Sequence, residues 1–273
     1  MDPEISAHYE LGLEADRLAT WGRIERERTM ALLERHLPPP PARVLDVGGG
    51  PGVYALRLAR AGYEVHLVDP VELHVAQARE ASAGQPGAPL ASAETGDARA
   101  LDAPDGSADA VLLLGPLYHL PDAGDRRRAL AEARRVLRAG GVLAAAAISR
   151  FAATIDGLLK RHLEDPAFEA ILEAGLRDGV HRNPDPAARP EWFTTAFFHR
   201  PDELAEVRAA GFALDALVAV EGVGALLADA GAWLDDPVLR GRLMRAISRV
   251  EAEPALLGAS PHLLAIGVAP GSA

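Results

Sequence analysis

Short apolar runs alternate along this chain with longer runs in which apolar residues recur at helical spacing. Strands joined by helices of this length predict a parallel sheet with right-handed crossovers and helices on both faces. The expected strands are residues 42–48, 64–68, 90–95, 109–114, 142–148, 212–220 and 262–268. The expected helices between them are residues 53–61, 71–83, 122–138 and 202–210. The hydrophobic pattern therefore predicts a doubly wound α/β fold with a seven-stranded sheet.

Two stretches interrupt this alternation and are too long for ordinary connections. Residues 150–200 are mostly helical and then proline-rich, and residues 223–252 form a second helical run. A further helical segment precedes the first strand and ends at prolines 38–41, which cannot continue a helix. The expected organisation is an N-terminal helical cover (1–40), a ligand-binding core (41–149), a helical cap insertion (150–200), and completion of the core (201–273) with a helical insertion at 223–252.

The composition narrows the classes of protein to which this fold could belong. A net charge of −11 disfavours a nucleic-acid partner, because phosphate binding needs concentrated lysine and arginine. The absence of cysteine excludes disulfides, thiolate metal sites and a cysteine nucleophile. No apolar run is long enough to span a membrane, and residues 1–4 lack the features of a signal peptide. We expect a cytoplasmic protein with no membrane partner, and the oligomeric state stays open.

The first strand ends in an acid and a glycine-rich turn, Asp46-Val47-Gly48-Gly49-Gly50-Pro51-Gly52. Glycines allow the dihedral angles of a tight turn and let the backbone approach a ligand closely. Asp46 places an anion at the strand tip, which suits a ligand that carries positive charge. Asp69 follows the second strand and Asp97 the third, so three acids lie at the sheet edge where open α/β sheets bind ligands. An acid in the position of Asp69 can accept hydrogen bonds from a ribose diol.

Taken together, these motifs resemble those of class I S-adenosylmethionine-dependent methyltransferases. The family's D-x-G-x-G-x-G turn is matched by Asp46, Gly48, Gly50 and Gly52. Its acid after the second strand is matched by Asp69, its G-D-A step by residues 96–98, and its R-x-L-x-x-G-G run by residues 135–141. The resemblance covers residues 42–148 well. It implies a Rossmann-like sheet of six parallel strands and one antiparallel strand, with helical cap insertions.

The resemblance also implies S-adenosyl-L-methionine as the cofactor and S-adenosyl-L-homocysteine as its product. The family's cofactor-binding positions fall on Asp46, Gly48, Gly50, Gly52, Asp69, Asp97, Ala98 and Leu114. The first two would hold the methionine part and Asp69 the ribose hydroxyls. Asp97 and Ala98 would hold the adenine, and the backbone near Leu114 the methionine amino group.

Two alternative functions remain open from the sequence. Residues 50–55 also satisfy G-x-G-x-x-A, a signature of dinucleotide-binding folds, which makes an NAD(P)-dependent oxidoreductase the first alternative. A pyrophosphate favours backbone N–H groups at a helix N-terminus, and the carboxylate of Asp46 would repel it. The second alternative is a protein that binds the methyl donor without catalysing transfer.

The acceptor side of the reaction is less well defined. We expect in-line displacement of the methyl group onto an O or N atom of a small metabolite or a chain terminus. His119 follows the fourth strand beside the expected methyl position, and it is the candidate general base or a residue that positions the acceptor. Tyr118, His181 and His199 are candidate acceptor-binding residues. No two histidines have metal-ligand spacing on one helix, so no metal is expected.

Two groups of arginines complete the expectations. Tyr9 and three arginines, Arg17, Arg23 and Arg28, lie in the N-terminal cover, where we expect most of the arginines to be solvated and one, Arg28 before the others, to pair with the methionine carboxylate. The run Arg126-Arg127-Arg128 is expected on a solvated helix face, because Leu130 and Leu137 supply the buried side of that helix.

Overall fold

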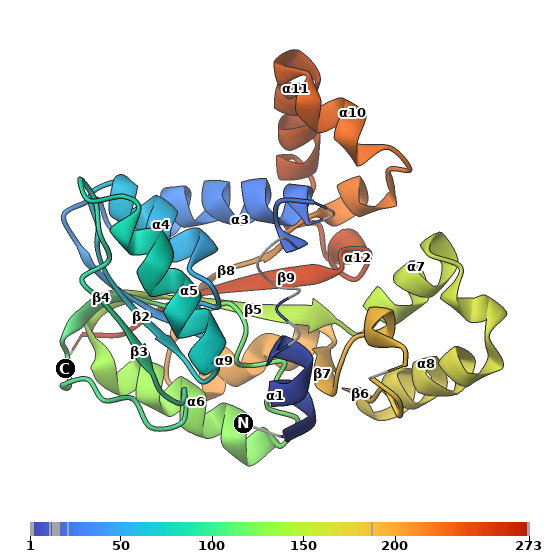
Figure 1. Ribbon diagram of the computed structural model, residues 1–273, viewed down its shortest axis with the longest axis horizontal. Helices are drawn as coiled ribbons and strands as arrows, with labels where there is room; N and C mark the ends of the chain where they lie inside the picture. The colour runs from blue at the N-terminus through green and yellow to red at the C-terminus, as the bar shows by residue number, and fades with distance from the viewer. Residues whose placement is uncertain (1–2, 11, 13–16, 21, 187, 272–273) are drawn as a thin grey trace.

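The computed structural model describes residues 3–10, 12, 17–20, 22–186 and 188–271. Its main sheet runs in the order β3-β2-β1-β4-β5-β9-β8 (Figure 1). The strands are β1 (Arg43–Val47), β2 (Glu64–Asp69), β3 (Ser92–Thr95), β4 (Ala108–Leu113), β5 (Leu137–Ser149), β8 (Ala213–Ala219) and β9 (His262–Val268). Only β9 runs antiparallel to its two neighbours among these described strands. The predicted sheet of six parallel strands and one antiparallel strand is therefore confirmed.

Helices cover both faces of this sheet, as the hydrophobic pattern predicts. The helices on one face are α3 (Arg23–His36), α4 (Val53–Arg60) and α5 (Glu72–Ala83). They contribute Leu33, Leu58 and Ala78 to an apolar core with β1, β2 and β4. The helices on the other face are α6 (Ala123–Val136) and α9 (Glu206–Ala209), which add Leu130 and Val207 to a second core (Figure 1). Burial of these two apolar layers fixes the strand ends in one row.

The cap insertion forms a separate lobe beside the carboxyl end of β5 (Figure 1). Its elements are α7 (Ala152–Leu159), η1 (His162–Glu164), α8 (Pro166–Asp178), β6 (Val180–His181), η2 (Pro190–Trp192) and β7 (Ala196–His199). The short strand β7 pairs in parallel with the end of β5 and antiparallel with β6, which the sequence pattern does not predict. Phe168 and Trp192 pack with Tyr118 in the core of the lobe. The lobe is thereby attached to the loop that follows β4.

The second insertion lies elsewhere in the molecule. Its elements are η4 (Gly222–Leu226), α10 (Ala230–Asp235) and α11 (Pro237–Ser248), and η3 (Pro201–Ala205) and α12 (Pro254–Leu257) flank the returning strands. Leu234, Leu243 and Ile247 pack against Ile24 of α3, so this unit projects from the far side of α3 (Figure 1). The N-terminal helix α1 (Pro3–Glu10) instead lies near the carboxyl ends of β4 and β5 (Figure 1). Within the described residues, no helix has the length and apolar character needed to cross a bilayer.

Candidate functional site

The glycine turn after β1 has a backbone that side chains would disrupt. Gly48 and Gly50 have φ angles of 71° and 56°, in the left-handed region that favours glycine. A Cβ atom on Gly48 would lie 2.8 Å from the ring of Pro116, which follows β4. The amide N–H of Gly48 donates to the carbonyl of Val68 at 2.7 Å. The turn therefore sits tightly between the ends of β2 and β4.

Asp46 lies buried beneath this turn, and neither carboxylate oxygen has a hydrogen-bond partner among the described residues. Burial, with the nearby charge of Asp69, raises the pKa of Asp46 to about 7. A buried carboxylate without a donor is unfavourable in its ionised form. A cationic group of a ligand above the turn would stabilise that form. The residue thus fits the ammonium or sulfonium group of the expected cofactor and disfavours a pyrophosphate.

Asp69, at the end of β2, is also buried. It lines the turn cavity and accepts hydrogen bonds from the backbone of two other residues that line it. One carboxylate oxygen accepts the N–H of Gly50 at 2.8 Å, and the other accepts the N–H of Val71 at 2.9 Å. The Nδ1 atom of His74 lies 3.1 Å from this second oxygen. Carboxylate oxygens accept more than one hydrogen bond each, so Asp69 retains capacity for the hydroxyls of a ribose.

Asp97 follows β3 and is held by an arginine two positions later. The backbone N–H and Nε of Arg99 both donate to one oxygen of Asp97 at 2.9 Å, and a guanidinium nitrogen donates to the other at 2.5 Å. Hydrogen bonding by Arg99 lowers the pKa of Asp97 to about 2 despite partial burial. Arg99 also donates to Asp125 of α6 at 2.6 Å. The carboxylate is therefore fixed and ionised at the position expected for the adenine.

Two adjoining cavities lie at this edge of the sheet. The first, here called the turn cavity, is lined by the glycine turn, by Asp46, Asp69, Asp97 and Ala98, and by Leu114 after β4. The second, the cap cavity, has a volume of about 680 Å³ and lies between α1 and the cap lobe. Among the described residues, four line both cavities: Tyr9, Arg17, Tyr118 and His262. These four side chains form the boundary between the two cavities.

His119 lies directly behind this boundary. Its Nε2 atom is 2.5 Å from the hydroxyl of Tyr9, and its ring packs edge-on against Tyr9 and Tyr118. Burial lowers the pKa of His119 to about 3, an effect that the nearby backbone of Thr195 only partly offsets. The imidazole is therefore neutral at physiological pH. It lines the turn cavity and contacts Tyr9, Tyr118 and Phe193, which line the cap cavity.

Two of the three predicted acceptor-binding residues line the cap cavity. Tyr118 lies at the boundary, where its hydroxyl donates to the carbonyl of Leu114 at 3.0 Å. His181 is buried in β6, stacks on Phe198, and donates from Nε2 to the carbonyl of Trp192 at 2.7 Å. Burial lowers the pKa of His181, so its side chain is neutral.

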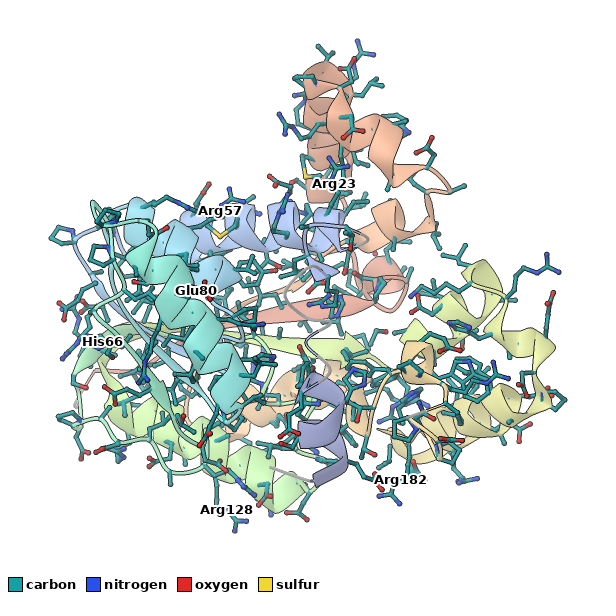
Figure 2. The ribbon with its side chains drawn as sticks, viewed as in Figure 1. Arg23, Arg57, His66, Glu80, Arg128 and Arg182 are labelled. Carbon is teal, nitrogen blue, oxygen red and sulfur yellow. The ribbon has the colours of Figure 1, made fainter. Side chains whose placement is uncertain are left out.

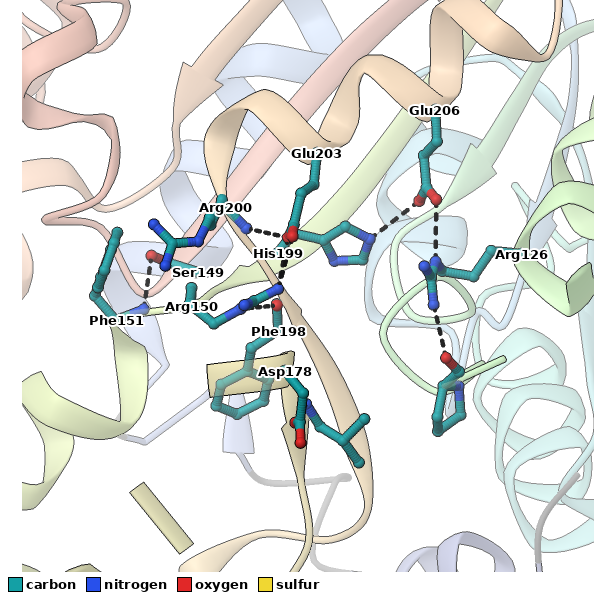
Figure 3. A network of polar contacts seen from close by, with 12 residues as sticks. Arg126, Ser149, Arg150, Phe151, Asp178, Phe198, His199, Arg200, Glu203 and Glu206 are labelled. Atoms are coloured by element: carbon teal, nitrogen blue, oxygen red, sulfur yellow. Dashed lines mark hydrogen bonds and ion pairs between the residues drawn. The ribbon is translucent and has the colours of Figure 1, made fainter. Parts of the chain in front are cut away.

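His199, the third predicted acceptor-binding residue, lies in a different part of the molecule. It is completely buried and lines neither cavity; its Nε2 lies 3.0 Å from Glu206 of α9 (Figure 3). Glu206 also accepts from Arg126 at 3.0 Å, and Arg126 donates to the carbonyls of two residues before α6. Arg126 is thus buried, and the expectation that it is solvated is wrong. His199 of β7 and Arg126 of α6 thus both bind Glu206 of α9, and this contact holds the three elements together.

Arg28 does not face the turn cavity. Its guanidinium is buried, donates to the carbonyl of Val220 at 3.0 Å and to Ser248 at 2.8 Å, and pairs with Glu251. The expectation that it holds the methionine carboxylate is therefore wrong. Arg17 lines the turn cavity in its place, with its guanidinium 2.5 Å from Glu25.

One group of metal-ligating types occurs in the described part of the chain. Glu25, Glu221 and His262 offer ligand atoms that lie within 4.8 Å of one another. The guanidinium of Arg17 already neutralises Glu25, and Nδ1 of His262 lies 2.5 Å from Glu221. The three residues therefore belong to a network of ion pairs in which Arg17 and His262 supply the positive charge. The expectation that the protein uses no metal stays a prediction.

His262 is the boundary residue that the sequence analysis missed, and it begins the last strand of the core. Tyr9 and Arg17 were named as residues of the N-terminal cover, with Arg17 as one of the arginines that could face the donor, and both line the turn cavity. Their signal in the sequence is weak, because helices and strand ends carry many such residues. Arg99 could have been found more easily, because an arginine two residues after an acid such as Asp97 can pair with it. The predicted insertion at 223–252 contributes no described residue to either cavity.

Comparison with known proteins agrees with this geometry. Residues 44–141 match the model of the methyltransferase domain family. The chain is 40% identical over 104 residues to the ubiquinone/menaquinone biosynthesis C-methyltransferase UbiE of Methylobacterium nodulans, covering 37% of this chain and 40% of that protein. It is 36% identical over 125 residues to the malonyl-[acyl-carrier protein] O-methyltransferase of Methylococcus capsulatus, covering 44% and 43%. The chain thus matches less than half the length of these relatives.

Among solved structures, a similar fold occurs in a putative methyltransferase of Haloferax volcanii, determined in complex with the Trm112 methyltransferase activator. The TM-score is 0.62 at 18% identity, and the match covers 98% of this chain and 99% of that one. At this level of identity the likeness concerns the fold. It extends over the cap as well as the core.

Proposed function

We propose that this protein, whose residues 44–141 match the methyltransferase domain family, transfers the methyl group of S-adenosylmethionine to an O or N atom of a small acceptor. The observation that carries this proposal is the shared boundary of the two cavities. The turn cavity has the acids and glycines that suit the methyl donor, and the cap cavity adjoins it through Tyr9 and Tyr118. Donor and acceptor can therefore be held next to each other where the two cavities meet.

The residues of the turn cavity fit the donor chemically. When bound, the donor supplies an activated methyl group on a sulfonium. Asp46 supplies a buried negative charge beneath the methionine part, Asp69 has acceptor capacity for the ribose, and Asp97 is fixed beside the adenine position. The protein's contribution to rate is then alignment of the acceptor atom and exclusion of water.

The cap cavity favours a small acceptor with an apolar body. Its wall contains Ile148, Phe168, Trp192, Phe193 and Phe198, which come from β5, α8, η2, the segment after η2, and β7. Aromatic side chains of this kind bind flat apolar groups through large contact areas. The cap lobe and α1 both border the cavity, which supports a small molecule or a chain terminus over a folded macromolecule.

We infer that His119 positions the acceptor through Tyr9 and does not remove its proton. A group with a pKa of about 3 is a weak base at neutral pH. The neutral imidazole fixes the Tyr9 hydroxyl at the cavity boundary, where that oxygen can hydrogen-bond with the acceptor. An acceptor that requires deprotonation would then release its proton to solvent.

His119→Gln is expected to raise the KM for the acceptor while kcat falls no more than about tenfold, as for loss of a positioning contact. Because His119 is neutral above about pH 3, it should add no inflection to the kcat profile between about pH 5 and pH 8. Steady-state kinetics of the variant and of His66→Gln, a histidine on β2 away from the cap (Figure 2), test this. A hundredfold loss of kcat in His119→Gln alone would identify His119 as the general base.

The activity itself is tested with isotopically labelled S-adenosylmethionine and a panel of small acceptors that carry hydroxyl or amino groups. The proposal predicts label in at least one acceptor and equimolar S-adenosylhomocysteine, both detected by mass spectrometry. Formation of neither product across the panel, by a protein that binds the donor, would favour the non-catalytic alternative.

A further inference from the structure

Two cations face the cap cavity where it meets the turn cavity. They are Arg17, which precedes α3, and His262, the first residue of β9. The carboxylates that pair with them lie behind them: Glu25 is 2.5 Å from Arg17, and Glu221 is 2.5 Å from Nδ1 of His262. Neither glutamate lines the cap cavity, although Glu25 lines the turn cavity. A ligand in the cap cavity therefore meets the positive side of both ion pairs.

The orientation of His262 is fixed by its glutamate. Glu221 accepts hydrogen bonds from Ser260 Oγ and from the backbone N–H of His262, each at 3.0 Å, as well as from the imidazole. Burial lowers the pKa of His262, but Glu221 and Glu25 outweigh burial and raise it to about 9. In the described part of the chain, Nε2 of His262 has no hydrogen-bond partner, and the side chain is about 20% exposed. At neutral pH this nitrogen carries a hydrogen available to a ligand.

The other charged groups of the cap cavity are paired with each other or with neighbours. Lys160 donates to Asp156 at 2.7 Å, and Glu191 lies 3.7 Å from Arg189. The remaining wall is largely aromatic and aliphatic. The described lining of the cavity thus combines an apolar wall with one positive end, and that end adjoins the proposed site of methyl transfer.

We propose that Arg17 and His262 bind a carboxylate of the methyl acceptor, which makes the acceptor an apolar or aromatic carboxylic acid. Two N–H donors with positive charge suit the two oxygens of a carboxylate, and such charge-assisted hydrogen bonds are stronger than neutral ones. The apolar body of the acid lies against the aromatic wall. The inference rests on the proposed function only in identifying the carrier of the carboxylate as the methyl acceptor.

The methyl donor also carries a carboxylate, on its amino-acid part. The turn cavity contains Glu25 beside the same two cations, so a carboxylate there meets a negative charge that a ligand of the cap cavity does not. The charge distribution favours the acceptor as the source. Because both the donor and the acceptor would present a carboxylate, the experiment must measure the binding of both.

The acceptor arm is isothermal titration of benzoate, 2-naphthoate and octanoate, each paired with its neutral amide, into protein with and without S-adenosylhomocysteine. Wild-type protein is expected to prefer a carboxylate to its amide. His262→Gln and Arg17→Gln should each weaken binding of that carboxylate by about tenfold to a hundredfold and leave the amide unchanged. His66→Gln should change neither, and melting temperatures check that each variant is folded. If no carboxylate binds better than its amide, the proposal is overturned.

A pH measurement separates charge from structure. In Glu221→Gln, His262 loses the partner that holds its proton, and its pKa falls toward the ordinary value of 6.5. The variant should bind the carboxylate at about pH 5.5 and lose most of that affinity by about pH 8, whereas wild-type protein should bind it at both. Equal affinity of the variant at both pH values would contradict a role for the imidazolium.

The donor arm compares S-adenosylhomocysteine with 5′-methylthioadenosine, which lacks the amino-acid carboxylate. The proposal predicts that His262→Gln and Arg17→Gln change the affinity for both nucleosides by similar, small factors. Selective loss of S-adenosylhomocysteine binding, with carboxylate probes unaffected, would assign the pair to the donor and overturn the proposal. Failure of wild-type protein to bind S-adenosylhomocysteine would contradict the proposed function. The comparison of carboxylates with their amides would still test whether Arg17 and His262 bind a carboxylate.

Discussion

Asp69→Ala is expected to weaken S-adenosylhomocysteine binding at least about a hundredfold, because two ribose hydroxyls lose a charged acceptor worth roughly 1.5–3 kcal/mol for each bond. It should also lower the free energy of unfolding. The carboxylate is buried and accepts the amide N–H groups of Gly50 and Val71, which are left without a partner in the variant. Each buried N–H that loses its acceptor costs about 1–3 kcal/mol.

Asp69→Asn separates these two effects, since an amide oxygen still accepts a backbone N–H but carries no charge. The affinity for S-adenosylhomocysteine, measured by titration calorimetry, should fall in both variants, while the melting temperature should fall further in Asp69→Ala. Asp102→Ala, at an exposed loop position outside both cavities, is the control. Normal affinity in a folded Asp69→Asn protein would mean that another residue holds the ribose.

Asp46→Asn is expected to stabilise the ligand-free protein at pH 8 and to weaken donor binding. The pKa of Asp46 is raised from 3.8 to about 7 in the folded state, so the folded protein favours the protonated carboxyl. Its contribution to stability is present below about pH 4 and is lost as the pH rises through about 7. At pH 8 the loss approaches about 4 kcal/mol, at 1.36 kcal/mol for each pKa unit. The amide of Asp46→Asn has no proton to lose in this pH range and stays uncharged, so it avoids this cost.

Urea unfolding at about pH 4.5 and pH 8 tests this directly. The free energy of unfolding of wild-type protein should fall more steeply between these values than that of Asp46→Asn, with Asp102→Asn behaving as wild type. Titration at pH 8 should show weaker S-adenosylhomocysteine binding in Asp46→Asn, because the ammonium group loses a nearby negative charge. If Asp46→Asn is the less stable protein at pH 8, then the carboxylate has a stabilising partner and the present description of it is wrong.

The lining of the turn cavity could be predicted because its elements are local in sequence. Asp46, Asp69 and Asp97 each lie at the end of a strand, and parallel strands bring those ends to one edge whatever the details of packing. The glycine turn follows the first of these strands directly. Strand periodicity and turn chemistry therefore place the acids together without knowledge of distant contacts.

The acceptor side depends on contacts between segments that are far apart in the chain. Tyr9 meets His119, and Arg17 lies with His262, and no local pattern encodes either pairing. The same limit explains the errors. Arg28 and His199 are of residue types that often bind ligands, which made them candidates. In the structure they pair with Glu251 and Glu206 and line neither cavity.

Competitive calorimetry with S-adenosylhomocysteine and NAD⁺ measures whether the turn cavity binds S-adenosylmethionine. We expect saturable binding of S-adenosylhomocysteine to wild-type protein, much weaker binding in Asp69→Asn, and far weaker binding of NAD⁺, whose pyrophosphate would meet the charges of Asp46 and Asp69. Binding of NAD⁺ as tight as that of S-adenosylhomocysteine, or tighter, would contradict it.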